Sequence, residues 1–253
     1  SNLSNKSIKR NKMIFLKYFK KILIQISSLF YFNKKSKVIF YHDIHDLISH
    51  TWMSTPIDLF KEHISIIRNE GYEIVNNITS EFGQIEICFD DGYQGIYDNI
   101  DYLKKNKIFI HLFIITSNIN KKGFLNNKQL EELNNLNLIT ISSHTHQHKI
   151  ATSQSHIDFK NDLIISKNYL QNLTNTNINS LCYPLGYYSQ MTNNIAKEVG
   201  FQKLYTCLPG FYLRNSPLNR SLVQFSQRSE FKAILKGGDH ILSIWYKLKY
   251  FKR

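Results

Sequence analysis

The sequence predicts an α/β domain in which a parallel sheet curls into a barrel. Short runs rich in Ile, Leu, Phe and Tyr alternate with helical segments, as expected of strands that are buried on both faces. Polar residues follow four of these runs at the point where each strand ends, which is where parallel α/β folds gather their active sites. With 253 residues, 42% of them apolar, the chain can form one such domain or two smaller ones.

Seven runs are predicted to be strands, and five segments between them to be helices. The strands are expected at residues 37–41, 84–89, 108–115, 138–143, 178–183, 203–206 and 221–226. The helices are expected at residues 56–70, 94–105, 127–136, 156–173 and 190–199. Pro56 in the first turn and Gly71 after the end are typical start and stop signals for the first helix. Ser155 and Asp158 form a capping-box-like start to the fourth, and Gly200 closes the fifth.

The two ends of the chain carry much of the net charge of +13, and the part between them is far less basic. This pattern suits an anionic membrane surface better than a nucleic-acid groove, so no nucleic acid is expected as a partner. Solvated basic tails, or ends that pack onto the barrel, are the alternatives. We expect a basic amphipathic leader over residues 1–36 with an interfacial helix at 13–32, a barrel over 37–228, and a basic aromatic tail or helix over 229–253.

Two further features limit the class of protein. The longest apolar stretch near the start, residues 22–32, is too short to span a membrane, and no small-residue cleavage site of a signal peptide follows it. Cys88, Cys182 and Cys207 lie in apolar runs without the spacing of a metal site or a disulfide framework. They are predicted to be small core residues.

Carboxylates and imidazoles follow two different predicted strands. Asp90 and Asp91 end the run at 84–89, while His144 and His148 follow the run at 138–143. Two imidazoles and one carboxylate are a common ligand set for catalytic zinc. The two histidines can converge on one ion if the segment coils, and His146 between them would then point away. One carboxylate can bind the ion, and the other can stay free as a general base for the bound water.

Three motifs resemble those of the polysaccharide deacetylases of carbohydrate esterase family 4, which share a domain with the nodulation chitooligosaccharide deacetylases. The motifs are CFDDGY at 88–93, HTHQH at 144–148 and CYPLGYYS at 182–189, and the resemblance runs from about residue 37 to 226. It implies a distorted, incomplete (β/α) barrel with about seven parallel strands and one divalent metal ion, usually zinc. By motif, Asp90 is the implied catalytic base, and the implied metal ligands are Asp91, His144 and His148.

The third motif implies a substrate groove and also departs from the family. The residues implied to line the groove are Tyr183, Pro184, Leu185 and Gly186, and the backbone N–H of Leu185 is the implied donor to the oxyanion. Most of the family has, at the position of Cys182, an arginine that orients the base. Leu185 replaces the family's tyrosine.

The general acid is the part of the family pattern with no clear counterpart. The usual late Leu-x-His motif is missing, and His240 in GGDHILS is a weak match to it. The branch that deacetylates poly-N-acetylglucosamine also has Tyr-Pro in its third motif, and it draws its acid from an early Tyr-His. The matching residue here is His42 in FYHDI, whose alternative role is packing against the barrel floor. Arg220 lies where that branch often carries an arginine, and is the candidate for orienting the base.

These residues predict a metal-dependent hydrolase that removes N-acetyl groups from the amino sugars of a bacterial surface polysaccharide or its lipid-linked precursor. Without an acid at His42, O-deacetylation becomes the alternative, because an amine leaves poorly unless it is protonated. A catalytically silent glycan-binding protein on the same fold is a second alternative, and a basic membrane- or nucleic-acid-binding protein with an incidental histidine cluster is a third. We expect an acetylated glycan as partner and a place in the cytoplasm or on the cytoplasmic face of the inner membrane, with export as the alternative.

Overall fold

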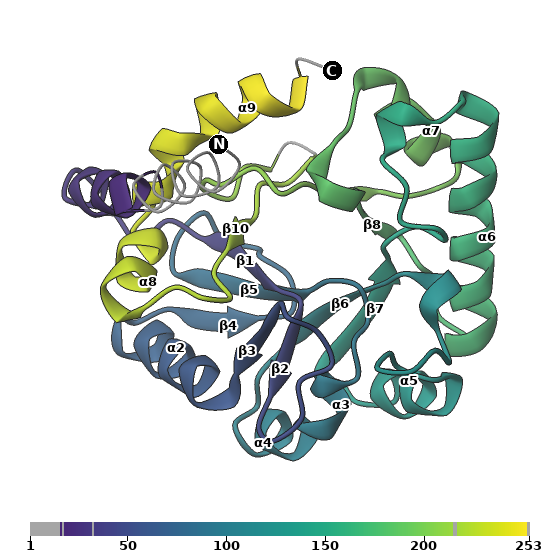
Figure 1. Ribbon diagram of the computed structural model, residues 1–253, viewed down its shortest axis with the longest axis horizontal. Coiled ribbons are helices and arrows are strands. Elements are labelled where there is room, and N and C mark those ends of the chain that lie inside the picture. Colours follow the sequence, from purple (N-terminus) through teal and green to yellow (C-terminus); the bar gives the residue numbers. More distant parts are fainter. Residues whose placement is uncertain (1–15, 17, 32, 215–216, 252–253) are drawn as a thin grey trace, which may run out of the picture.

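The computed structural model describes residues 16, 18–31, 33–214 and 217–251, which contain one large sheet surrounded by helices (Figure 1). The strands are β1 (Lys37–Tyr41), β2 (Asp43–His45), β3 (Ser54–Pro56), β4 (Glu73–Val75), β5 (Gln84–Phe89), β6 (Ile110–Ile114), β7 (Ile139–Ser143), β8 (Ser180–Cys182), β9 (Lys203–Tyr205) and β10 (Ser221–Leu222). The α-helices are α2 (Ile57–Asn69), α3 (Gly95–Asp98), α4 (Ile100–Lys105), α5 (Asn127–Asn134), α6 (His156–Thr174), α7 (Gln190–Glu198), α8 (Arg228–Leu235) and α9 (Ser243–Phe251). Short 3-10 turns are η1 (Thr116–Asn118), η2 (Ala151–Ser153), η3 (Pro184–Gly186) and η4 (Gly238–Leu242).

Seven parallel strands form a curled half-barrel in the order β10-β1-β5-β6-β7-β8-β9. β4 pairs with the first half of β5, and β6 pairs with its second half. Two further short strands, β2 and β3, pair with each other outside this sheet. The prediction of a distorted, incomplete barrel of about seven parallel strands is therefore confirmed.

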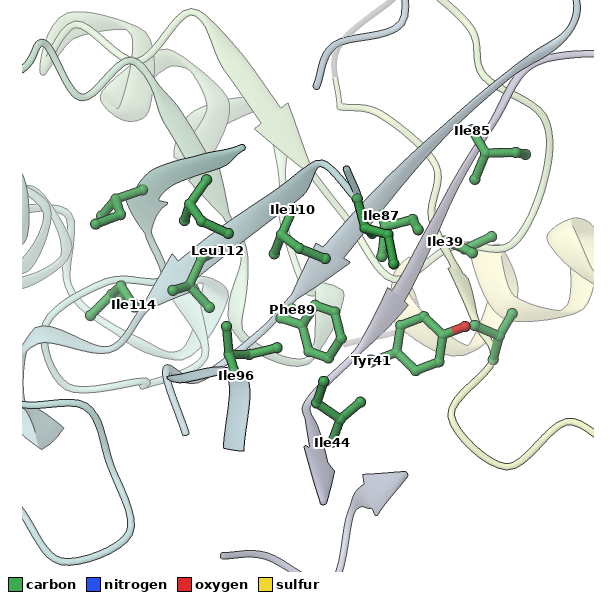
Figure 2. Close-up of a cluster of buried hydrophobic side chains, with 14 of the residues drawn as sticks. Ile39, Tyr41, Ile44, Ile85, Ile87, Phe89, Ile96, Ile110, Leu112 and Ile114 are labelled. Atoms are coloured by element: carbon green, nitrogen blue, oxygen red, sulfur yellow. The ribbon is translucent and has the colours of Figure 1, made fainter. Parts of the chain in front are cut away.

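Alternate residues of each strand pack into two separate apolar layers. Ile39, Tyr41, Ile87, Phe89 and Leu112 point into the layer between the sheet and the outer helices (Figure 2). The intervening positions fill the inside of the barrel with Val38, Phe40, Cys88, Phe113, Cys182 and Tyr205. Because both faces are buried, the strands are continuous apolar runs, which is why they could be recognised in the sequence.

The predicted elements differ from the observed ones in a few places. The predicted helix at 94–105 breaks at Asn99, whose side-chain amide donates to the Gly95 carbonyl at 2.9 Å and competes with the helical backbone pattern. The predicted strand at 221–226 pairs only over two residues. β2, β3 and β4 were not predicted, because three residues are too few to display a period.

The helix at residues 18–28 and α9 lie on the same side of the sheet, and Lys20 Nζ lies 4.0 Å from the centre of the Trp245 ring (Figure 1). Residues 18–28 are helical, whereas residues 13–15, 17 and 32 of the predicted interfacial helix lie outside the described residues. The Gln25 side chain donates to Ser229 Oγ of α8 at 3.1 Å, and Lys37 Nζ of β1 lies 2.7 Å from Asp239 Oδ1 of η4. The domain boundaries at 36 and 228 stay a prediction. Within the described residues, no helix has the length and apolar character needed to cross a bilayer.

Candidate active site

The site lies at the carboxyl ends of the sheet strands. His42 follows β1, Asp90 and Asp91 follow β5, His144 follows β7 and Tyr183 follows β8. Because these strands are parallel neighbours in one sheet, their carboxyl ends meet at one edge. A pocket of about 390 Å³ opens there, and the sequence-predicted residues among those lining it are His42, Asp90, Asp91, His144, His148 and Leu185.

The backbone at Asp91 brings two neighbouring carboxylates into the same pocket. Side chains of successive strand residues point to opposite faces, so Asp90 and Asp91 would normally diverge. Asp91 instead has a φ of 73°, in the left-handed region that residues other than glycine rarely adopt. Gly92 follows with a φ of 82°, and a Cβ at this position would lie 2.9 Å from Ile114. The turn thus directs both carboxylates to the pocket.

Asp91, His144 and His148 form a group that could hold a metal ion. Asp91 Oδ1 lies 3.5 Å from His144 Nε2 and 3.7 Å from His148 Nε2. The same oxygen is buried, and no described residue makes a hydrogen bond to it. A buried carboxylate oxygen without a donor is costly, and a cation held jointly with the two imidazoles would offset that cost. The donor set therefore fits a divalent ion such as zinc.

Hydrogen bonds from neighbouring groups orient His144 and the loop that carries His148. His144 Nδ1 donates to the Cys182 carbonyl oxygen at 2.8 Å, so Nε2 keeps its lone pair toward Asp91. Burial lowers the pKa of His144 to about 3, which keeps the ring neutral, as a metal ligand must be. Asp162 of α6 accepts hydrogen bonds from the backbone N–H groups of His146 and Gln147 at 2.7 and 3.0 Å, which fixes the loop that carries His148.

Asp90, unlike Asp91, is paired with a cationic side chain, that of Arg220. The Arg220 guanidinium makes two hydrogen bonds to Asp90, of 2.7 Å to Oδ1 and 2.8 Å to Oδ2, and both side chains are buried. Burial alone would raise the pKa of Asp90, but the attraction and hydrogen bonds of Arg220 outweigh it and hold the pKa below its usual value. Asp90 is therefore a carboxylate at neutral pH, fixed in one orientation.

Cys182 occupies the position where the family pattern has arginine, and Arg220 lies against it. Arg220 Nη2 donates to Cys182 Sγ at 2.8 Å, and Arg220 Nε donates to the Thr206 carbonyl at 3.0 Å. The guanidinium carbon also lies 4.4 Å from the centre of the Phe40 ring. A cation from the segment before β10 thus reaches the aspartate at the end of β5.

His42 and two alternative histidines lie in different surroundings. His42 lines the pocket, and its Nδ1 lies 2.7 Å from Gln224 Oε1, which can only accept, so Nδ1 carries the proton of that bond. His146 points away from the metal-ligand group, as predicted, and its Nδ1 pairs with Thr116 Oγ1 at 2.8 Å. His240 lies in η4 beside Phe211, and is not one of the residues that line the pocket.

The turn after β8 forms one wall of the pocket. Leu185 and Gly186 both have positive φ values, of 56° and 77°, and a Cβ on Gly186 would lie 2.8 Å from the backbone nitrogen of Cys207. Pro184 starts the turn, while the buried Tyr183 hydroxyl donates to Asn193 at 2.8 Å. Leu185 is half exposed at the pocket rim, whereas the Tyr183 side chain belongs to the apolar core.

Several residues of the site were not predicted from the sequence. Trp52 and Met53, before β3, line the pocket, and Trp52 is 82% exposed. A tryptophan in the segment 46–53, between the predicted strand at 37–41 and the predicted helix at 56–70, was the signal that could have indicated them. Gln224, which fixes His42, was hidden inside a run assigned to a strand.

A comparison with protein families matches residues 77–204 to the family described as "Polysaccharide deacetylase". The chain belongs to this family. The Bacillus subtilis (strain 168) protein YxkH is 27% identical over 187 residues, covering 70% of this chain and 66% of YxkH. A poly-beta-1,6-N-acetyl-D-glucosamine N-deacetylase of Staphylococcus epidermidis is 33% identical over 135 residues, covering 47% of this chain and 46% of the relative.

A solved structure supports the fold at lower sequence identity. The Streptococcus pyogenes deacetylase PplD in complex with acetate has a TM-score of 0.69 and 22% identity, covering 79% of this chain and 96% of PplD. The chain spans less than half of the staphylococcal relative and about two thirds of YxkH.

Proposed function

We propose that the protein is a metal-dependent hydrolase that removes N-acetyl groups from the amino sugars of a bacterial surface polysaccharide or its lipid-linked precursor. One observation carries the proposal. In the pocket, the Asp90 carboxylate is bound by Arg220. The neighbouring Asp91 has a buried oxygen that lies near two imidazoles and accepts no hydrogen bond from any described residue. This difference in surroundings suits Asp90 as a base and Asp91 as a metal ligand. Membership of the polysaccharide deacetylase family supports deacetylation as the reaction class.

Asp91, His144 and His148 would hold one divalent ion, with zinc favoured by two imidazoles and a carboxylate. When bound, the ion supplies Lewis-acid chemistry to the acetyl carbonyl and lowers the pKa of water. The turn at Leu185 lines the same pocket, so its backbone N–H is the proposed second donor to the developing oxyanion.

Asp90 is the proposed general base, because it is ionised and fixed beside the ligand group. Arg220 uses two parallel hydrogen bonds to set the plane of the carboxylate, which decides the direction from which a water proton can be accepted. The guanidinium lowers the basicity of Asp90, and in return keeps the carboxylate charged inside a buried site. Arg220 is therefore a positioning residue for the base.

His42 is the proposed general acid. Its Nδ1 proton is engaged by Gln224, so in the protonated ring the Nε2 proton is the one left to transfer to the departing nitrogen. Loss of such an acid would affect an amide more than an ester, because an alkoxide leaves more readily than an amide anion. The N-acetyl group is therefore the proposed substrate bond, with O-deacetylation as the alternative.

The glycan itself is proposed from chemistry and from a relative. The staphylococcal relative is named for poly-beta-1,6-N-acetyl-D-glucosamine, and an exposed tryptophan at the pocket rim suits stacking on a sugar ring. An acetylated glucosamine polymer is the first substrate to test. Attachment to an anionic membrane, a place on its cytoplasmic face and the alternative of export stay proposals, and the absence of a nucleic-acid partner stays a prediction.

The test combines metal analysis with an acetate-release assay on acetylated glucosamine oligomers. We expect one divalent ion per chain and metal-dependent release of acetate, both seen with the parent protein. The Asp90→Asn variant should keep the ion and lose turnover, because it replaces the proposed base and leaves the three proposed metal ligands in place. A parent protein that binds zinc and glycan but releases no acetate would instead be the silent glycan-binding alternative.

A further inference from the structure

The helix at residues 18–28 exposes several large apolar side chains, while two serines and Ile24 are buried. Ile22 and Ile26 are 52% and 51% exposed, and the same stripe continues through the exposed Leu29 and Phe30 in the following turn. Positions three and four residues apart lie on one face of a helix, so these residues form a single apolar stripe. The opposite face, which packs on the protein, includes Ile24, Ser27 and Ser28. A helix that only covers a soluble core would have the reverse pattern.

α9 adds a second exposed stripe beside the first. Ile241, at the end of η4, and Trp245 and Leu248 in α9 are 49%, 48% and 54% exposed at spacings of four and three residues. The two segments are in contact, because Lys20 Nζ lies 4.0 Å from the centre of the Trp245 ring. In Figure 1 the helix near the N-terminus and α9 lie on the same side of the sheet, away from α6. We call the joined surface, made of Ile22, Ile26, Leu29, Phe30, Ile241, Trp245 and Leu248, the terminal-helix face.

The two terminal segments of the sequence carry charges of only one sign, although Glu230 and Asp239 line the pocket beneath the two helices. No Asp or Glu occurs before Asp43 or after Asp239, while Lys and Arg occur fourteen times in those two segments. Lys20, Lys21 and Lys247 belong to the two helices themselves. Equal positive charges oppose the pairing of two copies through this face, whereas an anionic surface would attract it. Apolar side chains interleaved with lysines are the pattern of helices that lie in a lipid interface.

We propose that the terminal-helix face docks onto an anionic lipid bilayer, with the two helices lying in the plane of the interface. This inference does not rest on the proposed hydrolysis. A second pocket of about 340 Å³, lined by Ile24, Leu242 and Tyr246 of the terminal segments, shares walls with the candidate active site. The shared residues are Phe40, Cys207 and Leu222. The terminal segments therefore line a pocket that adjoins the candidate active site.

The experiment is sedimentation of the full chain with two kinds of vesicle. One is made of phosphatidylcholine alone, and the other also contains about 30% of the anionic lipid phosphatidylglycerol. We expect binding to the anionic vesicles that weakens with added salt and is at least about tenfold weaker on neutral vesicles. Ile22→Ser/Ile26→Ser should lower the partition coefficient by roughly tenfold or more, because it removes apolar contact. Lys21→Glu/Lys247→Glu should lower it by at least about 25-fold, since each lysine near such a surface contributes about fivefold and the anionic surface also repels the new carboxylates.

The matched control is Ile157→Ser/Ile165→Ser, which removes two exposed isoleucines from α6, a helix remote from the terminal-helix face (Figure 1). Circular dichroism spectra should match among all variants, because every changed side chain is substantially exposed or at the surface. Equal vesicle binding by the parent and the Ile22→Ser/Ile26→Ser variant would overturn the proposal, and so would an equal loss in the α6 control. A parent that ignores vesicles but forms a dimer, which the Ile22→Ser/Ile26→Ser change dissociates, would also overturn it in favour of self-association.

Discussion

Replacing Arg220 by Met should destabilise the protein by an amount that the buried contacts set. Asp90 is 2% exposed and Arg220 is fully buried, so the variant leaves a carboxylate buried without its cation. Removing one partner of a buried ion pair costs about 3 to 5 kcal/mol. The Thr206 carbonyl also loses a donor, which adds about 1 kcal/mol. We therefore expect the free energy of unfolding to fall by about 4 to 6 kcal/mol.

A graded set of variants separates the charge from the shape of the side chain. Arg220→Lys keeps a cation but loses the two parallel hydrogen bonds, so a smaller loss of about 1 to 2 kcal/mol is expected. The double variant Asp90→Asn/Arg220→Met contains neither charge, and should regain most of the stability lost by Arg220→Met. The double variant should still release no acetate, because the proposed base is gone.

The assay is urea unfolding followed by circular dichroism, on protein treated with a chelator so that metal binding does not contribute. Acetate release from the metal-loaded parent and variants completes the set, and Arg220→Met should lower kcat/KM by roughly 10² to 10⁴ through loss of an oriented base. An Arg220→Met protein within 1 kcal/mol of the parent, as a rough threshold, would contradict the buried-pair reasoning. A double variant no more stable than the single one would contradict it independently.

Three further outcomes follow from the site and the core. Treatment with a chelator should abolish acetate release, and added zinc should restore it, as measured on the same oligomers. His42→Ala should lower N-deacetylation by about 10² to 10⁴ but affect an O-acetyl ester much less, which a comparison of kcat on both substrates would reveal. Burial lowers the pKa of His63 from its ordinary 6.5 to about 4, so as the pH falls the unfolded chain takes up a proton before the folded one does. Stability should be independent of this group above pH 6.5 and fall by about 1.4 kcal/mol per pH unit between pH 6.5 and 4, and His63→Gln should remove this slope in urea unfolding.

The strand ends of the site could be predicted from the sequence, because the functional residues there directly follow the apolar strand residues along the chain. Asp90 and Asp91 directly follow a six-residue apolar strand, and the histidine run directly follows another. Parallel strands then bring these ends together whatever the exact boundaries. The predicted strands at 37–41 and 84–89 coincide with β1 and β5, which carry His42 and the two aspartates.

Contacts between distant segments could not be derived from residue patterns. Arg220 lies 130 positions from Asp90, and only the family resemblance indicated it. Gln224 meets His42 across 182 positions, and no local pattern marks either residue as a partner of the other. Asp162 in α6 was equally hidden, because its role is to accept from two loop amides that only the folded chain brings near.

The adjacent carboxylates divide their tasks because their surroundings compensate charge in different ways. Asp90 receives a full cation from Arg220, while the two thiols near that guanidinium, Cys182 and Cys207, do not compete for its charge. Burial raises the pKa of Cys207 to about 11 and that of Cys182 well above its ordinary value, so both stay neutral. Arg220 and Asp90 therefore cancel each other, and nothing among the described side chains does the same for Asp91, whose pKa burial raises. The remaining carboxylate oxygen faces the imidazoles of His144 and His148, which is where a divalent cation would be bound most strongly.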